Sequence, residues 1–138
     1  MFFNDKSIND LKSKAESGDM EAQCYLADLY ADDSRVDTFN ITEAVYWYEK
    51  AAEQGHSRAQ WLLGACYSQG VGVSKDLDKA ESWLLKSAQA GDADGQYTLG
   101  GFYFMLPDIV KAEYWIGLAA EQEHGEAKAA LVAIKQLM

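Results

Sequence analysis

Proline and long apolar runs are nearly absent from this sequence. Its 138 residues include a single proline, which favours continuous helices joined by short turns because proline interrupts a helix. No stretch approaches the roughly 18 uninterrupted apolar residues of a membrane span, so we expect no membrane insertion. The N-terminal residues also lack the basic and then apolar order of a secretory signal. We therefore expect a cytoplasmic protein, although a signal removed before this sequence begins would leave the same pattern.

Basic residues are scarce as well. The sequence has 12 Lys and Arg against 22 Asp and Glu, a net charge of −10. Residues 1–54 hold 12 acidic and 5 basic residues (net −7), and residues 55–138 hold 10 and 7 (net −3). This charge disfavours nucleic acid and favours a protein or peptide partner with a basic patch. Equally, the acidity can serve solubility alone.

The chain repeats itself. Three segments that each begin at a glycine can be laid over one another: 18–54, 55–90 and 91–122, of 37, 36 and 32 residues. A period of this length predicts a solenoid of helical hairpins, in which each unit buries its apolar face against its neighbours. The predicted fold is all-α, an α/α superhelical solenoid of about eight helices. We predict one domain over residues 1–138, with three full repeats and capping helices in 1–17 and 123–138.

Each repeat reads as a helix A, a turn and a helix B, with apolar residues spaced along one helical face. Glycine inside a helix costs ~1 kcal/mol relative to alanine, so its return at one helix A position indicates a contact with no room for a larger side chain. Aromatic residues are predicted to fill the space between hairpins. We assign structural roles to Tyr30, Tyr67, Tyr103, Trp47, Trp83, Trp115, Gly64 and Gly100.

Helix boundaries carry the residues that end helices well. Side chains that accept hydrogen bonds from the first turn stand before five predicted helices, and glycines suited to a left-handed backbone follow the B helices. The predicted N-caps are Asp19, Asn40, Asp76, Asp92 and Asp108, and the glycines are Gly18, Gly55 and Gly91. After the third B helix, the equivalent position holds Glu123 instead of glycine. In the terminal helix A, Val132 stands where the earlier A helices have glycine. Both departures fit a terminal cap. The recurring Gln23, Gln60 and Gln96 are predicted to satisfy backbone groups of a neighbouring turn.

The central unit resembles a Sel-one-like repeat, a longer-period relative of the tetratricopeptide repeat. Its run is Gly55-x-x-x-Ala-Gln-x-x-Leu-Gly-x-x-Tyr-x-x-Gly-x-Gly-Val-x-Lys-Asp-x-x-Lys-Ala-x-x-Trp-Leu-x-Lys-Ser-Ala. The resemblance covers nearly the whole chain and implies an α/α superhelix that serves as an adaptor, with the concave face of the A helices as the usual binding surface. It does not imply an enzyme. Two turns depart from the pattern: 31–39 is longer and acidic, and 104–107 is shorter.

Several chemical motifs have simpler interpretations. Gly70-Val-Gly72 follows a helix and lacks the remaining residues of a phosphate-binding loop, so we interpret it as a turn. His56 and His124 lie two repeats apart, too far to share a metal ion at roughly 8–10 Å per packed helix. Cys24 and Cys66 fall at different repeat positions, unlike the cysteine pairs of the secreted relatives, and we predict free thiols. No catalytic, cofactor or metal residues are assigned.

The remaining candidate sites lie on the surface. Helix A residues opposite the packed face are predicted to pave a concave groove, acidic towards the N-terminal end and more apolar towards the C-terminal end. They are Glu21, Tyr25, Asp28 and Asp32 in the first repeat, Arg58, Leu62, Ala65 and Gln69 in the second, and Asp94, Thr98, Gly101 and Met105 in the third. A second candidate is an apolar patch at Phe104 and Met105, although the short turn can equally fold these side chains inward.

The leading hypothesis is a non-catalytic cytoplasmic adaptor of bacterial origin that binds a partner protein or peptide in this groove, without a cofactor. One alternative is a small immunity protein that neutralises a basic toxin or enzyme, given the concentrated negative charge. Another is a weak hydrolase of the β-lactamase type, as in the cysteine-rich relatives. We expect a monomer or a weak dimer.

Overall fold

The computed structural model describes residues 5–138, with side chains described from Ser7 onward. These residues form eight helices and no strand, as predicted. The helices are α1 (Asp5–Glu16), α2 (Met20–Ala31), α3 (Ile41–Glu53), α4 (Ser57–Gln69), α5 (Leu77–Gln89), α6 (Ala93–Met105), α7 (Ile109–Glu121) and α8 (Gly125–Leu137). Residues 1–4 of the predicted N-terminal cap lie outside the described residues.

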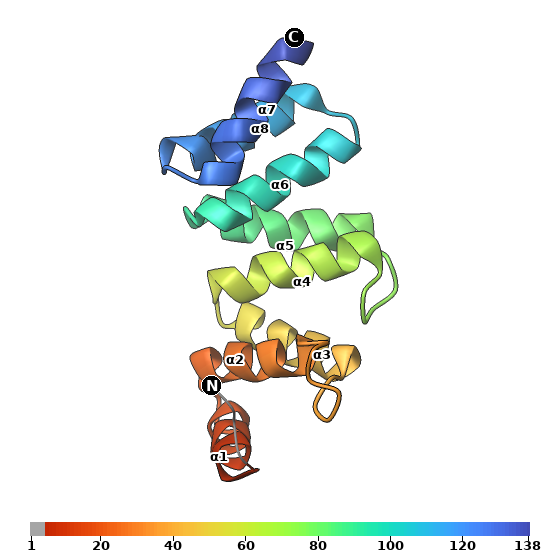
Figure 1. Ribbon diagram of the computed structural model, residues 1–138, viewed down its shortest axis with the longest axis vertical. Coiled ribbons are helices and arrows are strands. Elements are labelled where there is room, and N and C mark those ends of the chain that lie inside the picture. Colours follow the sequence, from red (N-terminus) through yellow and green to blue (C-terminus); the bar gives the residue numbers. More distant parts are fainter. Residues whose placement is uncertain (1–4) are drawn as a thin grey trace.

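The helices stack in chain order along the long axis of the molecule, with α1 at one end and α8 at the other (Figure 1). Each helix packs mainly against the next one in the sequence, and α4 also contacts α6. The A helices are α2, α4, α6 and α8, and the B helices are α1, α3, α5 and α7. This is the predicted solenoid of hairpins.

Side-chain caps begin seven of the helices. The five predicted N-caps each accept a hydrogen bond from the backbone N–H three residues ahead. His56 and His124 do the same for α4 and α8, with Nδ1 accepting from the N–H of Ala59 and Ala127. Sequence reasoning missed these two because histidine is a less common cap than aspartate or asparagine. Both histidines therefore have a structural role at a helix start.

Left-handed residues lie between each B helix and the next A helix, as predicted. Gly18, Gly55 and Gly91 have φ of 104°, 93° and 89°. Glu123 occupies the same place before α8 with φ 65°. A non-glycine residue in this conformation costs about 1 kcal/mol or more.

The same type of backbone hydrogen bond closes each of the three turns from helix A to helix B, although the turns differ in length. The N–H of the B-helix cap donates to the carbonyl of the recurring tyrosine: Asn40 to Tyr30 at 2.8 Å, Asp76 to Tyr67 at 2.9 Å, and Asp108 to Tyr103 at 2.7 Å. Extra residues in the first turn therefore bulge outward without changing how its hairpin closes.

The third turn is shorter than the sequence suggested. Phe104 and Met105 belong to the last turn of α6, and the connection consists of residues 106–108. The helix ends at Met105 with Leu106 as its C-cap, because Pro107 has no backbone N–H with which to continue it.

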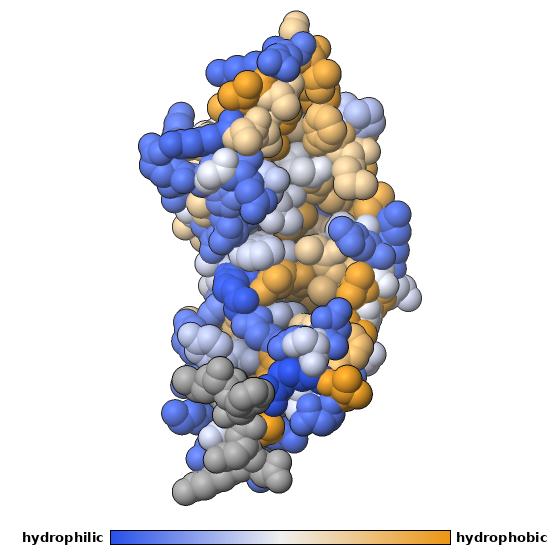
Figure 2. Space-filling view, in the orientation of Figure 1, coloured by the Kyte–Doolittle hydropathy of each residue, from blue (hydrophilic) through white to orange (hydrophobic). Residues whose placement is uncertain are grey.

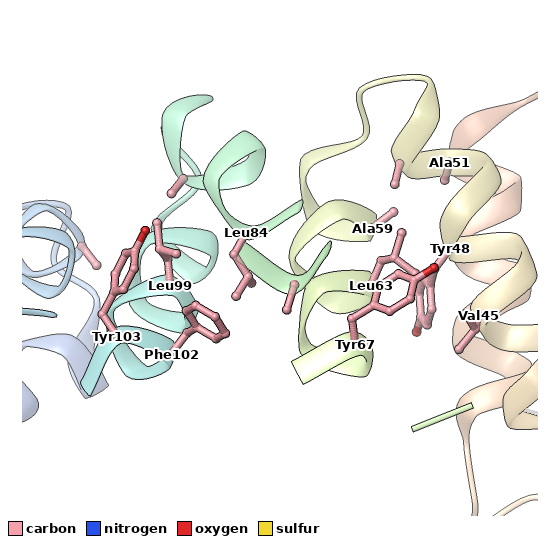
Figure 3. Packing of buried hydrophobic residues seen from close by; sticks show 14 of the residues in the cluster. Val45, Tyr48, Ala51, Ala59, Leu63, Tyr67, Leu84, Leu99, Phe102 and Tyr103 are labelled. Carbon is pink, nitrogen blue, oxygen red and sulfur yellow. The ribbon is translucent and has the colours of Figure 1, made fainter. Parts of the chain in front are cut away.

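Leucine and alanine form the centre of the core. Leu26, Leu63, Leu84 and Leu99 are the largest fully buried apolar side chains. In Figure 3, Leu63 and Tyr67 of α4 point toward Val45 and Tyr48 of α3, and Leu84 lies between this group and Leu99 with Phe102. Eight alanines with no exposed surface let the helices approach closely: Ala27, Ala44, Ala51, Ala59, Ala80, Ala112, Ala119 and Ala127.

The recurring aromatic residues pack at different depths. Tyr67 and Tyr103 are buried, whereas Tyr30, Trp47, Trp83 and Trp115 are half-buried against the edge of the core. The residue after each tryptophan is the buried one: Tyr48, Leu84 and Ile116. The central helix contact is therefore made one position beyond the tryptophan.

The recurring glutamines have the structural role that the sequence predicts. Nε2 of Gln23, Gln60 and Gln96 donates to the carbonyl of Ala15, Ala52 and Ala88, each eight residues earlier in the preceding B helix. These bonds fix each A helix against the end of the previous hairpin.

Candidate functional site: the concave face of the A helices

The predicted groove residues differ in how free their side chains are. Tyr25 is 61% exposed, and Asp32 and Gln69 are exposed as well. Leu62 is half-buried and packs against the core. Thr98 is also half-buried, and its hydroxyl donates to the Asp94 carbonyl. The other polar groove residues take part in bonds between helices.

Asp28 and Arg58 form an ion pair that joins α2 to α4. The guanidinium donates to both carboxylate oxygens, at 2.6 and 3.1 Å. The Tyr48 hydroxyl of α3 also donates to Asp28, at 2.6 Å. Arg58 further contacts the Cys24 sulfur at 3.3 Å. Arg58 and Asp28, both predicted as contacts for a partner, therefore hold the first two repeats together.

This network changes the acid–base properties of its members. The Asp28 carboxylate raises the pKa of Arg58 by hydrogen bonding, so the guanidinium stays charged. Burial, and then the hydrogen bond to Asp28, raise the pKa of Tyr48. Burial also raises the pKa of the Cys24 thiol to about 11. Cys24 is therefore protonated and a weak nucleophile at neutral pH.

Two histidines link successive A helices at their N-terminal ends. His56 Nε2 lies 3.2 Å from Glu21, and His124 Nε2 lies 2.9 Å from Asp94. Since Nδ1 of each ring accepts a backbone hydrogen bond, the protonated nitrogen of the neutral ring is Nε2. His124 Nε2 donates to Asp94, and His56 Nε2 lies in contact with Glu21. Glu21 and Asp94, predicted as groove contacts, therefore already have partners within the protein.

Three exposed carboxylates lie in the turn after α2. Asp32 accepts bonds from the backbone and hydroxyl of Ser34, which lower its pKa. Asp33 and Asp37 are exposed. This turn therefore presents negative charge next to the groove rather than along it.

An apolar cavity of about 580 Å³ opens on the C-terminal half of the groove. The predicted positions Gln69, Thr98 and Met105 lie in its wall, together with Ala65 and Gly101. Phe104 also lines it, so the two proposed surfaces form one site. In Figure 2, the upper right of the view, over the C-terminal ends of α6 and α8, is largely orange and tan.

Sequence reasoning missed a whole wall of this cavity. Four residues of α8 line it: Ala130, Ala133, Ile134 and Leu137. The B helices also line the cavity, through Leu77 and Leu84 of α5 and Ile116 of α7. Ala133 and Leu137 are exposed and Ala130 is half-buried. Their apolar spacing along α8 could have indicated a groove wall had the terminal helix been treated as part of the binding face.

Both cysteines are free, as predicted. Cys24 is 2% exposed and Cys66 is half-buried. They lie on α2 and α4, and burial raises the pKa of the Cys66 thiol too. Neither thiol is disposed for nucleophilic chemistry at neutral pH.

The repeats and their geometry identify the family. The Sel1 repeat matches residues 21–56, 57–92 and 93–124, and the chain belongs to the Sel1 repeat family. Repeats of this family generally mediate protein–protein interactions.

Two solved structures from bacteria have the same fold. A Sel1 repeat protein from Oxalobacter formigenes is 38% identical with a TM-score of 0.76, over 93% of this chain and 98% of that one. A protective antigen present in uropathogenic Escherichia coli strains, which displays an SLR fold, is 34% identical with a TM-score of 0.88, over 96% of this chain and 29% of that one.

A rat protein named DAP3-binding cell death enhancer 1 is 34% identical over 94 residues. The match covers 68% of this chain but spans only 18% of the rat protein. Among the described residues, no helix is long and apolar enough to cross a membrane.

Proposed function

We propose that this chain is a non-catalytic binding protein that holds a segment of a partner protein on the concave face of its A helices. The observation that carries the proposal is the apolar cavity walled by α4, α6 and α8. Its rim exposes Met105 (83%) and Leu137 (65%). Exposed apolar surface around an apolar hollow is typical of a protein-binding site.

The proposed partner presents positive charge. The chain has a net charge of −10, and acidic surfaces attract and orient basic partners. A cytoplasmic location is proposed because both cysteines are free thiols. One domain over residues 1–138, with the repeat limits given above, remains a prediction.

A photo-crosslinking comparison tests the binding face. Benzoylphenylalanine is introduced in place of Met105 on the concave face and, as a control, in place of Tyr114, which is 61% exposed on the B helix α7. We expect a specific crosslinked partner from the first position only, after irradiation in cells of the source organism. Equal crosslinking from both positions, or crosslinking from Tyr114 alone, would contradict the concave-face assignment.

The second candidate function is that of an immunity protein for a basic toxin. It is favoured by the concentration of charge in residues 1–54, where the net charge is −7 of the total −10. Association would then depend steeply on ionic strength. A measured association rate that changes little between low and high salt would exclude it.

A further inference from the structure

The cavity accepts apolar groups and little else. Lys75 is the single charged residue among those that line it. The remaining lining is apolar or uncharged, including Phe102, Met105, Ile116 and Ile134. Since moving a charged group into such surroundings is costly without a partner, the part of a ligand that enters the cavity must be apolar.

The cavity is also open, so its occupant extends beyond it. Met105 and Leu137 at the rim are largely exposed, and Leu106 is 46% exposed. An apolar floor that continues into an apolar rim matches a polypeptide with several apolar side chains better than a small enclosed ligand. Methionine is flexible and adapts to different side chains, which suits Met105 to this role.

Negative charge lies along the same edge of the solenoid. The turns from helix A to helix B lie on one side of the stack (Figure 1). The first of these turns, residues 32–37, contains three aspartates and Arg35, a net charge of −2. Glu21, Asp28 and Asp94 contact a histidine or an arginine, whereas among the described residues the exposed Asp33 and Asp37 have no such partner, so their charge is available to a partner protein.

The spacing between these two features follows from the repeat. The A helices α2, α4 and α6 are successive layers of the stack. At about 10 Å between neighbouring helix axes, the distance from α2 to α6 is roughly 20 Å. An extended chain advances about 3.3 Å per residue, so about six residues span this distance.

We propose that the partner segment is bipartite: an apolar cluster occupies the cavity of α4, α6 and α8, and a Lys/Arg cluster about six extended residues away lies on the acidic turn 32–37. This inference rests on the proposed function and specifies the chemistry of its partner. The cavity provides the contact area, and the acidic turn selects the charge and the direction of the segment.

Synthetic peptides test the arrangement. The probe carries a fluorophore, a Leu-Phe-Leu anchor, a six-residue Gly/Ser spacer and three lysines, and it is made in both orders. Its controls replace the lysines with glutamates, replace the anchor with serines, or shorten the spacer to one residue. In fluorescence anisotropy, we expect one order of the full probe to bind and each control to bind at least about tenfold more weakly.

Two matched pairs of protein variants locate the clusters. Apart from the neighbouring residues and backbone of its own helix, no atom lies within 4 Å of a Cβ built on Gly101 or on Gly117. Gly101→Phe therefore fills the cavity, and Gly117→Phe places the same group on the B helix α7. Asp33→Lys with Asp37→Lys reverses the acidic turn, and Glu53→Lys with Glu121→Lys makes the same charge change at exposed ends of B helices. We expect about tenfold weaker binding from the first member of each pair and little change from the second.

The outcomes separate this inference from the proposed function. If Gly101→Phe weakens binding but the glutamate or short-spacer peptide binds as well as the full probe, the bipartite inference is wrong and concave-face binding stands. If Leu-Phe-Leu alone binds as tightly, the cavity is a site for small apolar ligands and the inference is wrong again. If Gly101→Phe and Gly117→Phe behave alike, the cavity is not the binding site. Should Gly101→Phe fail to fold by circular dichroism, Met105→Glu at the exposed rim makes the same test.

Discussion

Gly64 of α4 lies directly against Leu84 of α5. A Cβ built on Gly64 would lie 2.7 Å from Leu84 Cγ and 3.1 Å from the carbonyl oxygen of Ala80. The two helices therefore approach so closely that glycine is required at this position, although it is a poor helix former. Gly100 meets Ile116 of α7 in the same way.

The first prediction compares two helix glycines. Gly64→Ala is expected to destabilise the protein by about 1–3 kcal/mol, because the new methyl group on α4 pushes away Leu84 and the Ala80 backbone of α5. Gly101→Ala is the control: its Cβ meets no atom within 4 Å, so better helix propensity should stabilise the protein by up to about 1 kcal/mol. Urea unfolding of both variants makes the comparison. Equal effects would mean that α4 and α5 do not approach as described.

The second prediction concerns adjacent residues of α5. Leu84 is 1% exposed, and Leu84→Ala is expected to cost about 3–5 kcal/mol through lost burial and a residual cavity. Trp83 is half-buried, with the Lys86 ammonium 4.5 Å from its ring centroid. Trp83→Ala should cost less than Leu84→Ala in thermal or urea unfolding, and the reverse order would contradict this packing of α5.

The third prediction concerns the thiols. Cys24 is almost fully buried, and burial raises the pKa of its thiol to about 11. In native protein at pH 8, Cys24 should therefore react with a thiol reagent much more slowly than the half-buried Cys66, and both should react rapidly after unfolding. Cys66→Ala isolates the Cys24 rate. The double variant Cys24→Ala with Cys66→Ala should remain folded, and a native disulfide in freshly purified protein would contradict both the free-thiol assignment and a reducing location.

The fourth prediction is a loss of stability at alkaline pH. In the folded protein, the pKa values of Cys24, Tyr48 and Tyr103 are all raised. Above the ordinary pKa of each group, the unfolded chain loses protons that the folded protein keeps, so ionisation favours unfolding. Stability should be constant towards neutral pH and fall by about 1 kcal/mol per pH unit from about pH 9, where Cys24 begins to contribute, and more steeply above about pH 10, where the two tyrosines add to it.

Urea midpoints between pH 7 and about 12 measure this decline, and two variants divide it between its sources. Cys24→Ala should reduce the decline between about pH 9 and 11, and Tyr48→Phe should reduce it above about pH 10 while removing the hydrogen bond to Asp28. A decline that is identical in all three proteins would assign it to other groups.

Local sequence determined the helices and their ends. Asp19, Asn40 and Asp76 cap helices through bonds to residues three positions ahead, and Gly55 adopts the left-handed backbone for which glycine is suited. Such features depend on neighbours along the chain, so their spacing alone identifies them. The repeat also predicted the hairpin stack, because each unit can bury its apolar face only against the next one.

Tertiary structure decided which surface residues are free. Asp28, Arg58 and Glu21 belong to the predicted face, yet their bonds join residues 20 to 35 positions apart. Helical periodicity places a side chain on a face but does not say which residue of the next helix it meets. The distance and tilt between packed helices set those contacts, and they also bring α8 over α6 to complete the apolar cavity.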